Sequence, residues 1–463
     1  VFAPTIRFHK GRFYMVTTND TTHENFYVWT DDIRGEWSDP VTIDQGGIDP
    51  SLLFDEGHVY FLSNGADENG VGGVTQCEID IATGRKLTPS RCIWQGNGGR
   101  YLESPHVYHI GPWYYLLAAE GGTEVFPIYG ELSDEERALY DKIRDAVMNF
   151  EEFVTFEPAV PKSTVRDIYR LVYSQERKYF WLSSLFYSPD EEVSALRLNY
   201  LYEREEAELM RAELDMAAST IIGGIPEGAD EFETVVYFHD EIVRGCEFST
   251  EKEHVNSAYG VLVSGYGQCE GYAAAMALLC DKAGIPNFVV CGTNSEGSTH
   301  AWNKIMLDGE WYNADCTWDD PIIKRDNPDF VRHDYLLVKD SEIEGISHFT
   351  DGLYDGYAVC DSGRLNYFAG RGLMFGTADE AVKSLKEQLR TKGLAGEREV
   401  EVRISDGDAY FAAVERLFDG GEMKQIIEDV NANYGTKIRS AYKHNNDDLC
   451  IIHISLIFEG DGE

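Results

Sequence analysis

A cysteine at the start of a predicted helix is the most reactive group in the sequence. Cys269 follows the glycine-rich stretch Ser-Gly-Tyr-Gly-Gln at 264–268 and opens an alanine-rich run that ends at Gly284 and Pro286. The unpaired N–H groups and the dipole of a helix N-terminus stabilise a thiolate, the nucleophilic form of cysteine. The same N–H groups can bind the oxyanion that forms during acyl transfer. Cys269 is therefore predicted to be a nucleophile with a lowered thiol pKa.

A base for this thiol, and a carboxylate that orients the base, are predicted on a β-hairpin. The dipeptide Asp308-Gly309 is a strong signal for a two-residue turn between strands. If the residues that flank this turn pair with each other, His300 and Asp315 share one face as diagonal neighbours. The three side chains then form a Cys-His-Asp triad. A register slip of one residue would place His300 and Asp315 on opposite faces.

Each of these residue types also has a common structural role. A lone cysteine on an alanine-rich helix is usually a core residue, a histidine in a strand is usually a structural one, and an aspartate near a turn is usually a solvated cap. The agreement between the helix start and the hairpin register favours the triad over these alternatives.

Two carboxylates near the N-terminus form a second candidate site. Asp49, in Gly-Ile-Asp-Pro-Ser, and Glu103, in Tyr-Leu-Glu-Ser-Pro, each directly precede a short apolar strand. Two carboxyl groups that face a sugar can act as acid and base in glycoside hydrolysis, with the pKa of one of them raised. The pattern therefore predicts a carbohydrate site.

An internal repeat positions these carboxylates. Pro4, Pro50 and Pro105 lie 46 and 55 residues apart, and each is followed by a strand, a turn and a second strand. Short strands with polar turns at such a period are typical of propeller blades. The third unit ends after two strands, so the sequence predicts a partial propeller.

Helix-forming patterns replace the strands after residue 124. Apolar residues at three- and four-residue spacing predict helices over 132–150, with Ser133 as N-cap, and over 164–185, 189–219, 230–244 and 269–283. Strands are predicted over 288–293, 300–307 and 310–318. An α+β tail begins near 377, with helices near 378–391, 408–418 and 421–433 and strands near 398–404, 436–443 and 448–458.

Composition excludes several classes of function. The chain has 463 residues and 81 acidic against 40 basic side chains, a net charge of −41 that disfavours nucleic acid and anionic membranes as partners. Apolar runs are too short to span a bilayer, so we expect a soluble protein. The nine cysteines include no CxxC pair, and neither a metal nor a cofactor is predicted. Localisation stays open between the cytoplasm and secretion with the signal absent from this sequence.

The cysteine motif resembles a known family. Gly267-Gln-Cys-Glu-Gly-Tyr-Ala, His300-Ala-Trp-Asn and Asp315-Cys-Thr-Trp-Asp-Asp-Pro resemble the bacterial transglutaminase-like superfamily over about 130–345. The resemblance implies a papain-like α+β core with Cys269 as nucleophile, His300 as base and Asp315 as the group that orients the base. It also implies a protein or peptide substrate, although some members are inactive binding modules. The second oxyanion donor is left open between Gln268 and Tyr266.

The N-terminal motifs resemble a second family. Ala3-Pro-Thr-Ile-Arg-Phe-His, Gly47-Ile-Asp-Pro-Ser-Leu and Arg100-Tyr-Leu-Glu-Ser-Pro-His are similar to the second and third blades of family 43 glycoside hydrolases, such as β-xylosidases and arabinofuranosidases. The resemblance implies a five-bladed propeller, a pKa-modulating role for Asp49, a general-acid role for Glu103 and a plant-type oligosaccharide as ligand. The blade that would carry the catalytic base is absent from this sequence, so we expect no hydrolysis by the usual two-carboxylate route.

Together these patterns predict a multidomain chain. A partial all-β propeller of incomplete five-bladed type covers 1–124, a helical segment plus a transglutaminase-like α+β core covers 125–345, and a small α+β domain covers 346–463. The leading hypothesis is a Cys-His-Asp enzyme for acyl transfer or hydrolysis at peptide or amide groups. The alternatives are a glycoside hydrolase, incomplete in this chain, and a non-catalytic binding module.

Overall fold

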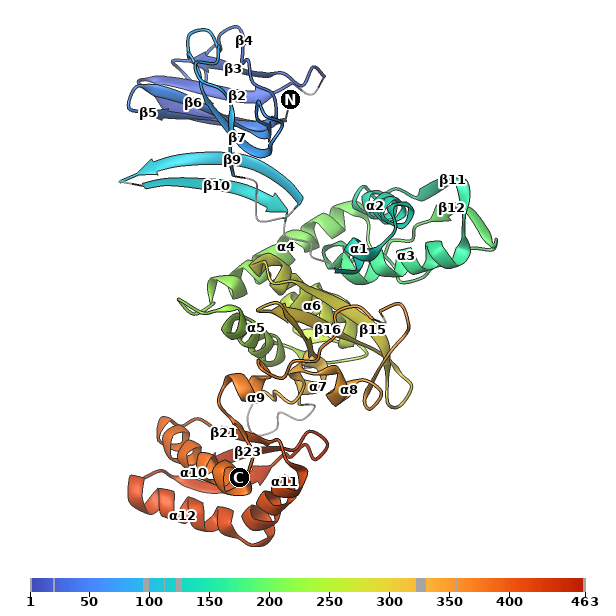
Figure 1. Cartoon of the computed structure of the whole chain (residues 1–463), viewed down its shortest axis with the longest axis vertical. Helices are drawn as coiled ribbons and strands as arrows, with labels where there is room; N and C mark the ends of the chain where they lie inside the picture. The colour runs from blue at the N-terminus through green and yellow to red at the C-terminus, as the bar shows by residue number, and fades with distance from the viewer. Residues whose placement is uncertain are drawn as a thin grey trace. The chain divides into compact units, whose positions relative to one another are not determined.

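The structure of the chain is a computed structural model (Figure 1). It describes residues 2–19, 21–94, 100–111, 113–121, 127–321, 330–354 and 356–460. The chain divides into two compact units, Val1–Val125 and Phe126–Glu463, and each unit is described by itself. Within these ranges, none of the helices combines the length and the apolar character that crossing a bilayer requires.

The first unit consists of antiparallel sheets. Strands rich in β-branched and aromatic residues alternate with polar turns, a composition that favours half-buried strands. The first sheet has the order β1-β2-β3-β4, the second β5-β6-β7-β8, and the third contains β9 and β10 alone. The strands are β1 (Phe2–His9), β2 (Arg12–Thr18), β3 (Asn25–Thr30), β4 (Val41–Thr42), β5 (Ile48–Asp55), β6 (His58–Ala66), β7 (Gly72–Glu78), β8 (Arg91–Trp94), β9 (Arg100–Ile110) and β10 (Trp113–Gly121). The three sheets correspond to the three predicted repeats, but within the described residues they do not close into a propeller.

A hydrophobic core joins the two four-stranded sheets. Val16 and Tyr27 of the first sheet pack with Leu52 and Phe61 of the second, and all four side chains are buried. Strand β5 also lies beside β1 and β9, so the first strands of the three sheets are neighbours. This arrangement brings the start of β5 close to β9, the two strands that carry the predicted carboxylates.

The second unit begins with helices packed around a two-stranded sheet. Helix α2 starts at the predicted N-cap, where Ser133 and Glu136 exchange hydrogen bonds in a capping box. The elements before the cysteine helix are α1 (Pro127–Glu131), α2 (Asp134–Met148), β11 (Phe153–Pro161), α3 (Lys162–Gln175), η1 (Arg177–Tyr179), β12 (Glu192–Arg197), α4 (Arg204–Gly223), α5 (Glu231–Gly245), β13 (Glu247–Phe248), η2 (Gly260–Ser264) and β14 (Tyr266–Gly267). The apolar faces of α2, β11, α3 and β12 share one core with Trp302 of the central sheet, and α5 packs in a second core with the helix that begins at Cys269.

The predicted helix over 189–219 is wrong at its N-terminal end. The segment contains strand β12, which pairs antiparallel with β11, and helix α4 begins only at Arg204. Val193 and Leu196 are buried, and their three-residue spacing imitates a helix face. Pairing with β11, a strand that the sequence analysis did not predict, outweighs this local pattern. The helix predicted over 164–185 likewise ends early, at Gln175.

A five-stranded antiparallel sheet forms the centre of the second unit. Its order is β18-β17-β16-β15-β19, and helix α6 packs against β15 and β16. The elements are α6 (Cys269–Ala283), β15 (Asn287–Asn294), β16 (Thr299–Leu307), β17 (Glu310–Ala314), α7 (Cys316–Asp319), β18 (Leu336–Val338), α8 (Asp340–Ile343) and β19 (His348–Thr350). The small side chains of Ala273 and Ala277 meet Val289 and Ala301 across this contact, which lets the helix approach the sheet closely.

A second sheet with three helices completes the unit. It has the order β20-β21-β23-β22, and Val400, Ile452 and Ile454 pack against Leu385 and Leu389 of α10. The elements are α9 (Tyr367–Gly370), β20 (Met374–Phe375), α10 (Ala378–Ala395), β21 (Glu399–Ile404), α11 (Gly407–Val414), η3 (Glu415–Asp419), α12 (Glu422–Tyr434), β22 (Ile438–Lys443) and β23 (Ile451–Phe458). The whole second unit is thus a mixed α+β region.

Candidate active site

The hairpin brings His300 and Asp315 together. Strands β16 and β17 pair in the predicted register, with Leu307 opposite Glu310. Asp315 follows the last residue of β17, where the chain leaves the sheet and enters α7 rather than continuing the strand predicted to 318. Nε2 of His300 lies 2.6 Å from Oδ2 of Asp315. The predicted imidazole–carboxylate contact is therefore present.

Four neighbouring groups contact the Asp315 carboxylate. Its Oδ1 accepts hydrogen bonds from the backbone N–H groups of Thr317 and Trp318, at 2.9 and 3.3 Å, and so caps α7. Its Oδ2 lies 3.0 Å from Nε2 of His348 in addition to the contact with His300. Because Asp315 is 2% exposed, these contacts fix its orientation and direct a ring nitrogen of each histidine toward it.

Cys269 is the first residue of α6, as predicted. Its thiol is half-buried and interacts with the ring of His300. Since Nε2 of His300 bonds to Asp315, Nδ1 is the ring nitrogen left for the thiol. The amide of Asn303 donates a 3.0 Å hydrogen bond to the carbonyl of Ala273, one turn after Cys269, and so ties β16 to the start of the helix.

The charges of the site favour a protonated imidazole. Burial alone lowers the pKa of His300, but the Asp315 carboxylate and the Cys269 thiol raise it to about 10. Burial alone raises the pKa of Asp315, but His300 and His348 together hold it below its ordinary value. At neutral pH the thiol therefore faces a proton donor, the arrangement that cysteine acyl-transfer chemistry uses.

His348 is a site residue that the sequence analysis missed. It lies on β19, which joins the sheet beside β15, and Gly292 makes the approach possible because a Cβ there would lie 2.0 Å from the carbonyl oxygen of Phe349. The His348 ring contacts the indoles of Trp302 and Trp318, with centroids 4.9 and 4.7 Å away. His348 is 33 positions from Asp315 in the sequence, and no motif or turn predicts that the two residues meet.

The second oxyanion donor stays open between Gln268 and Tyr266. Gln268 is the N-cap of α6, but its side chain does not bond to the first turn. The Tyr266 ring lies 5.0 Å from the ammonium group of Lys252. The backbone N–H of Cys269 remains the predicted first donor.

The structure also brings the two carboxylate segments of the first unit together. Asp49 is buried, and its Oδ2 accepts a hydrogen bond from the backbone N–H of Ser104 at 3.2 Å. Asp49 and Ser104 both have positive φ, +54° and +49°, and each precedes a proline at a register shift. Glu103 lies on β9, but its side chain is outside the described part of the structure. The second carboxylate site is therefore described only at Asp49.

Two groups within the described ranges have the donor types and spacing of metal ligands. They are His300, Asp315 and His348, and His239, Asp240 and His333. In the first group Asp315 caps α7 and His300 faces the thiol, so its members already have partners in the candidate active site.

Comparison with known proteins agrees with both sets of motifs. Residues 1–143 match the family model of glycosyl hydrolases family 43, and residues 219–316 match the transglutaminase-like superfamily. The chain joins a family 43 segment to a transglutaminase-like core. The family 43 match extends past the β-rich unit into α2.

Several relatives share the family 43 segment. A non-reducing end alpha-L-arabinofuranosidase of Bacteroides ovatus is 40% identical over 125 residues, which are 26% of this chain and 23% of that protein. A xylosidase/arabinosidase of Butyrivibrio fibrisolvens is 40% identical over 134 residues, 27% of this chain and 26% of that protein. The chain thus spans about a quarter of the length of the curated relatives it matches.

Two solved structures are similar to parts of the chain. The family 43 protein from the Bacteroides ovatus xyloglucan locus is 40% identical, covers 27% of this chain and 24% of its own, and has a TM-score of 0.24. A putative cysteine protease from Cytophaga hutchinsonii is 19% identical over 26% of this chain and 40% of its own, with a TM-score of 0.21.

Proposed function

We propose that the transglutaminase-like core is a thiol enzyme that transfers acyl groups or hydrolyses bonds at peptide or amide groups. Cys269 is the nucleophile, His300 the general acid and base, and Asp315 the residue that orients His300. His348 contacts the same Asp315 oxygen as His300 and helps to fix the carboxylate. The substrate is a protein or a peptide.

The chemistry divides into two steps. In the first, the Cys269 thiolate forms a C–S bond with the substrate carbonyl, the C–N bond breaks, and the His300 imidazolium gives its proton to the leaving amine. In the second, water or another amine forms a bond with the thioester carbonyl and loses its proton to His300, and the C–S bond breaks, which restores the thiolate. The N–H groups at the start of α6 stabilise the oxyanion of both steps.

One observation carries this proposal. His300 contacts Asp315 through Nε2, and the Cys269 thiol lies near enough to the same ring to raise its pKa, so a single imidazole lies between the nucleophile and a buried carboxylate. A histidine with a merely structural role would need only one of these two partners.

The test uses a glutamine-containing peptide with a fluorescent primary amine, and the same peptide with water alone. Amine incorporation indicates transfer, and product release without amine indicates hydrolysis. Cys269→Ser should abolish both activities, and Cys450→Ser, a half-buried cysteine outside the site, should retain them. If the wild-type chain shows neither activity and iodoacetamide does not prefer Cys269, the domain is a binding module and the proposal is wrong.

A glycoside hydrolase is the second candidate. It is favoured by the hydrogen bond from Ser104 to Asp49, which brings the Glu103 segment beside Asp49, and by the family 43 match. In this reading the three sheets are blades of an incomplete propeller, Asp49 tunes a pKa, Glu103 is the general acid, and a plant-type oligosaccharide is the ligand. No residue of this chain is assigned as base, so hydrolysis by the usual route is not expected from this chain alone.

A further inference from the structure

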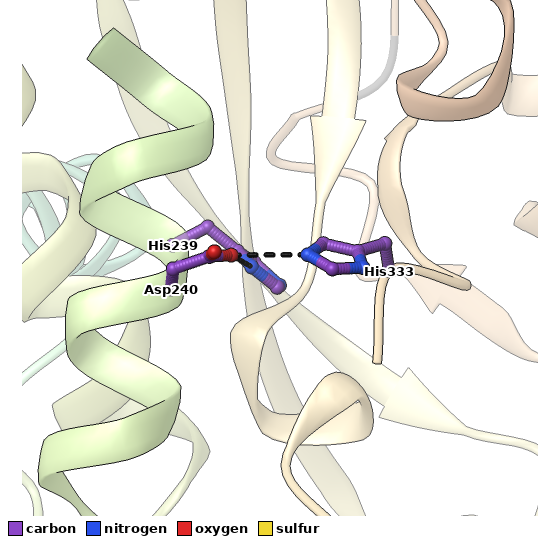
Figure 2. A group of neighbouring side chains, drawn as sticks. All are labelled: His239, Asp240 and His333. Carbon is purple, nitrogen blue, oxygen red and sulfur yellow. Dashed lines mark hydrogen bonds and ion pairs between the residues drawn. The ribbon is translucent and has the colours of Figure 1, made fainter. Parts of the chain in front are cut away.

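A second cluster of histidines and carboxylates lies in the transglutaminase-like unit, apart from the cysteine site. His239 and Asp240 are neighbours on α5, and His333 lies in the segment that precedes β18. Figure 2 shows the His333 ring facing the two side chains of the helix. Oδ1 of Asp240 lies 3.3 Å from Nδ1 of His239 and 3.0 Å from Nε2 of His333.

These separations match the coordination sphere of zinc. Zinc binds imidazole nitrogen and carboxylate oxygen at about 2.0–2.2 Å in tetrahedral geometry, which places neighbouring ligand atoms roughly 3.4 Å apart. The two measured separations are 3.3 and 3.0 Å, and all three ligand atoms lie within 4.8 Å of one another. One ion can therefore contact all three residues with small adjustments.

The outer nitrogens of both histidines bond to buried carboxylates. Nε2 of His239 lies 3.1 Å from Oδ2 of Asp319, and Nδ1 of His333 lies 3.1 Å from Oε1 of Glu401. A carboxylate behind each ligating histidine fixes its ring and its tautomer, and it is the usual surrounding of a metal site. Asp319 is itself fixed by the backbone N–H of Tyr335 at 3.0 and 3.1 Å.

The negative charge of the cluster also favours a bound cation. With neutral imidazoles, the carboxylates of Asp240, Asp319 and Glu401 carry three negative charges. Among the described residues, the Arg244 guanidinium lies 2.9 Å from Oδ2 of Asp240 and offsets one of these charges by direct contact. A divalent ion would neutralise the remaining two. Two protonated imidazoles would do the same, and this rival arrangement binds no metal.

We propose that His239, Asp240 and His333 form a binding site for one zinc ion. A cavity of about 400 Å³ is lined by Asp240 and His333, together with Glu401, and it is large enough to hold a water molecule as the fourth ligand. Two nitrogens, one carboxylate and one water are a usual ligand set for zinc with an open position. Neither family resemblance nor the cysteine chemistry requires this site.

The experiment measures metal bound to the full chain. After purification and dialysis we expect one zinc per chain by mass spectrometry, and substitution by Co²⁺ should give the visible spectrum of a tetrahedral site without the thiolate charge-transfer band. Calcium and magnesium, which prefer sites built from oxygen, should not displace zinc. A thiolate band would assign the metal to cysteines and overturn the proposal.

Variants separate this site from the other histidine group. His333→Gln and Asp240→Asn should each weaken zinc binding by at least tenfold in competition with a chromophoric chelator, and Glu401→Gln should weaken it by about 10–100-fold. Asp240 is partly exposed, so its variant keeps the test valid if the buried His333 variant does not fold. His348→Gln should retain the zinc.

Chelation provides an independent readout. EDTA should lower the melting temperature of the wild-type chain more than that of Asp240→Asn, because the variant binds zinc more weakly and loses less stabilisation when the metal is removed. A wild-type chain that takes up no zinc, or a zinc ion that survives in Asp240→Asn and is lost in His348→Gln, would overturn the proposal.

Discussion

Replacing Asp315 by asparagine tests whether the buried carboxylate controls the thiol, because the change removes a charge and leaves the volume almost unaltered. In the wild type, one oxygen caps α7 and the other contacts both His300 and His348. Asparagine offers one oxygen and one NH₂ group. If the oxygen keeps the cap, the NH₂ group points at two ring nitrogens that must then present lone pairs.

The magnitude follows from the electrostatics of His300. Without the carboxylate, the attraction that offsets burial is largely lost, and the pKa of His300 should fall from about 10 toward its ordinary value of 6.5. At about 1.4 kcal/mol for each factor of ten in proton affinity, the imidazolium loses at most about 5 kcal/mol of stabilisation. At neutral pH the thiol then lacks its proton donor, and we expect acyl transfer to fall by about 10²–10⁴-fold.

The assay is the rate at which iodoacetamide alkylates Cys269, followed by peptide mass spectrometry from about pH 5 to pH 9. The wild type should react near pH 6, and the Asp315→Asn variant should be at least tenfold slower there. Asp308→Asn is the matched control, because that exposed carboxylate lies at the turn of the same hairpin and pairs with Arg364. A folded Asp315→Asn variant that reacts at the wild-type rate at every pH would show that this carboxylate does not control the thiol.

Other consequences can be measured on the same chain. Because the folded-state pKa of His300 is raised to about 10, its protonation stabilises the fold below about pH 6.5, and this stabilisation is lost as the pH rises toward 10. Urea unfolding between these values should show a decline of at most about 1.4 kcal/mol per pH unit that is absent in His300→Asn. Gly292→Ala should destabilise the chain by about 1–3 kcal/mol and slow alkylation, because its Cβ would collide with the carbonyl of Phe349; unchanged melting would contradict this. Aryl β-xyloside and aryl α-arabinofuranoside should not be cleaved, and turnover that disappears in Glu103→Gln would show that the chain has a complete glycosidase site.

The features that sequence analysis predicted well are specified by neighbouring residues. The turn residues Asp308 and Gly309 both have positive φ, +50° and +79°, as a type I′ turn requires, and this turn sets the register that brings His300 to Asp315. The helix that begins at Cys269 ends with Gly284 at φ +75°. In each case a few adjacent residues determine the local geometry, so the turn and the helix end can be predicted from the sequence alone.

The features that it missed depend on contacts between distant segments. His348 reaches Asp315 only because β19 pairs with β15, and the two residues are 33 positions apart. His333 and Asp240 are 93 positions apart and meet only in the folded chain. On α5, His239 and Asp240 resemble ordinary residues of an amphipathic helix. A search for closely spaced cysteine pairs could not have detected a cluster of this kind.

Helix α7 connects the candidate thiol site with the proposed zinc site. Asp315 is its N-cap and Asp319 its last residue, and each buried carboxylate directs a histidine, one toward the thiol and the other toward the zinc ligands. The two aspartates lie about one helical turn apart. We expect loss of zinc to free the His239 ring, which Asp319 contacts, and to loosen the C-terminal end of α7. Loss of zinc should therefore slow alkylation of Cys269. Removing the thiol changes neither aspartate, so Cys269→Ser should bind zinc as the wild type does.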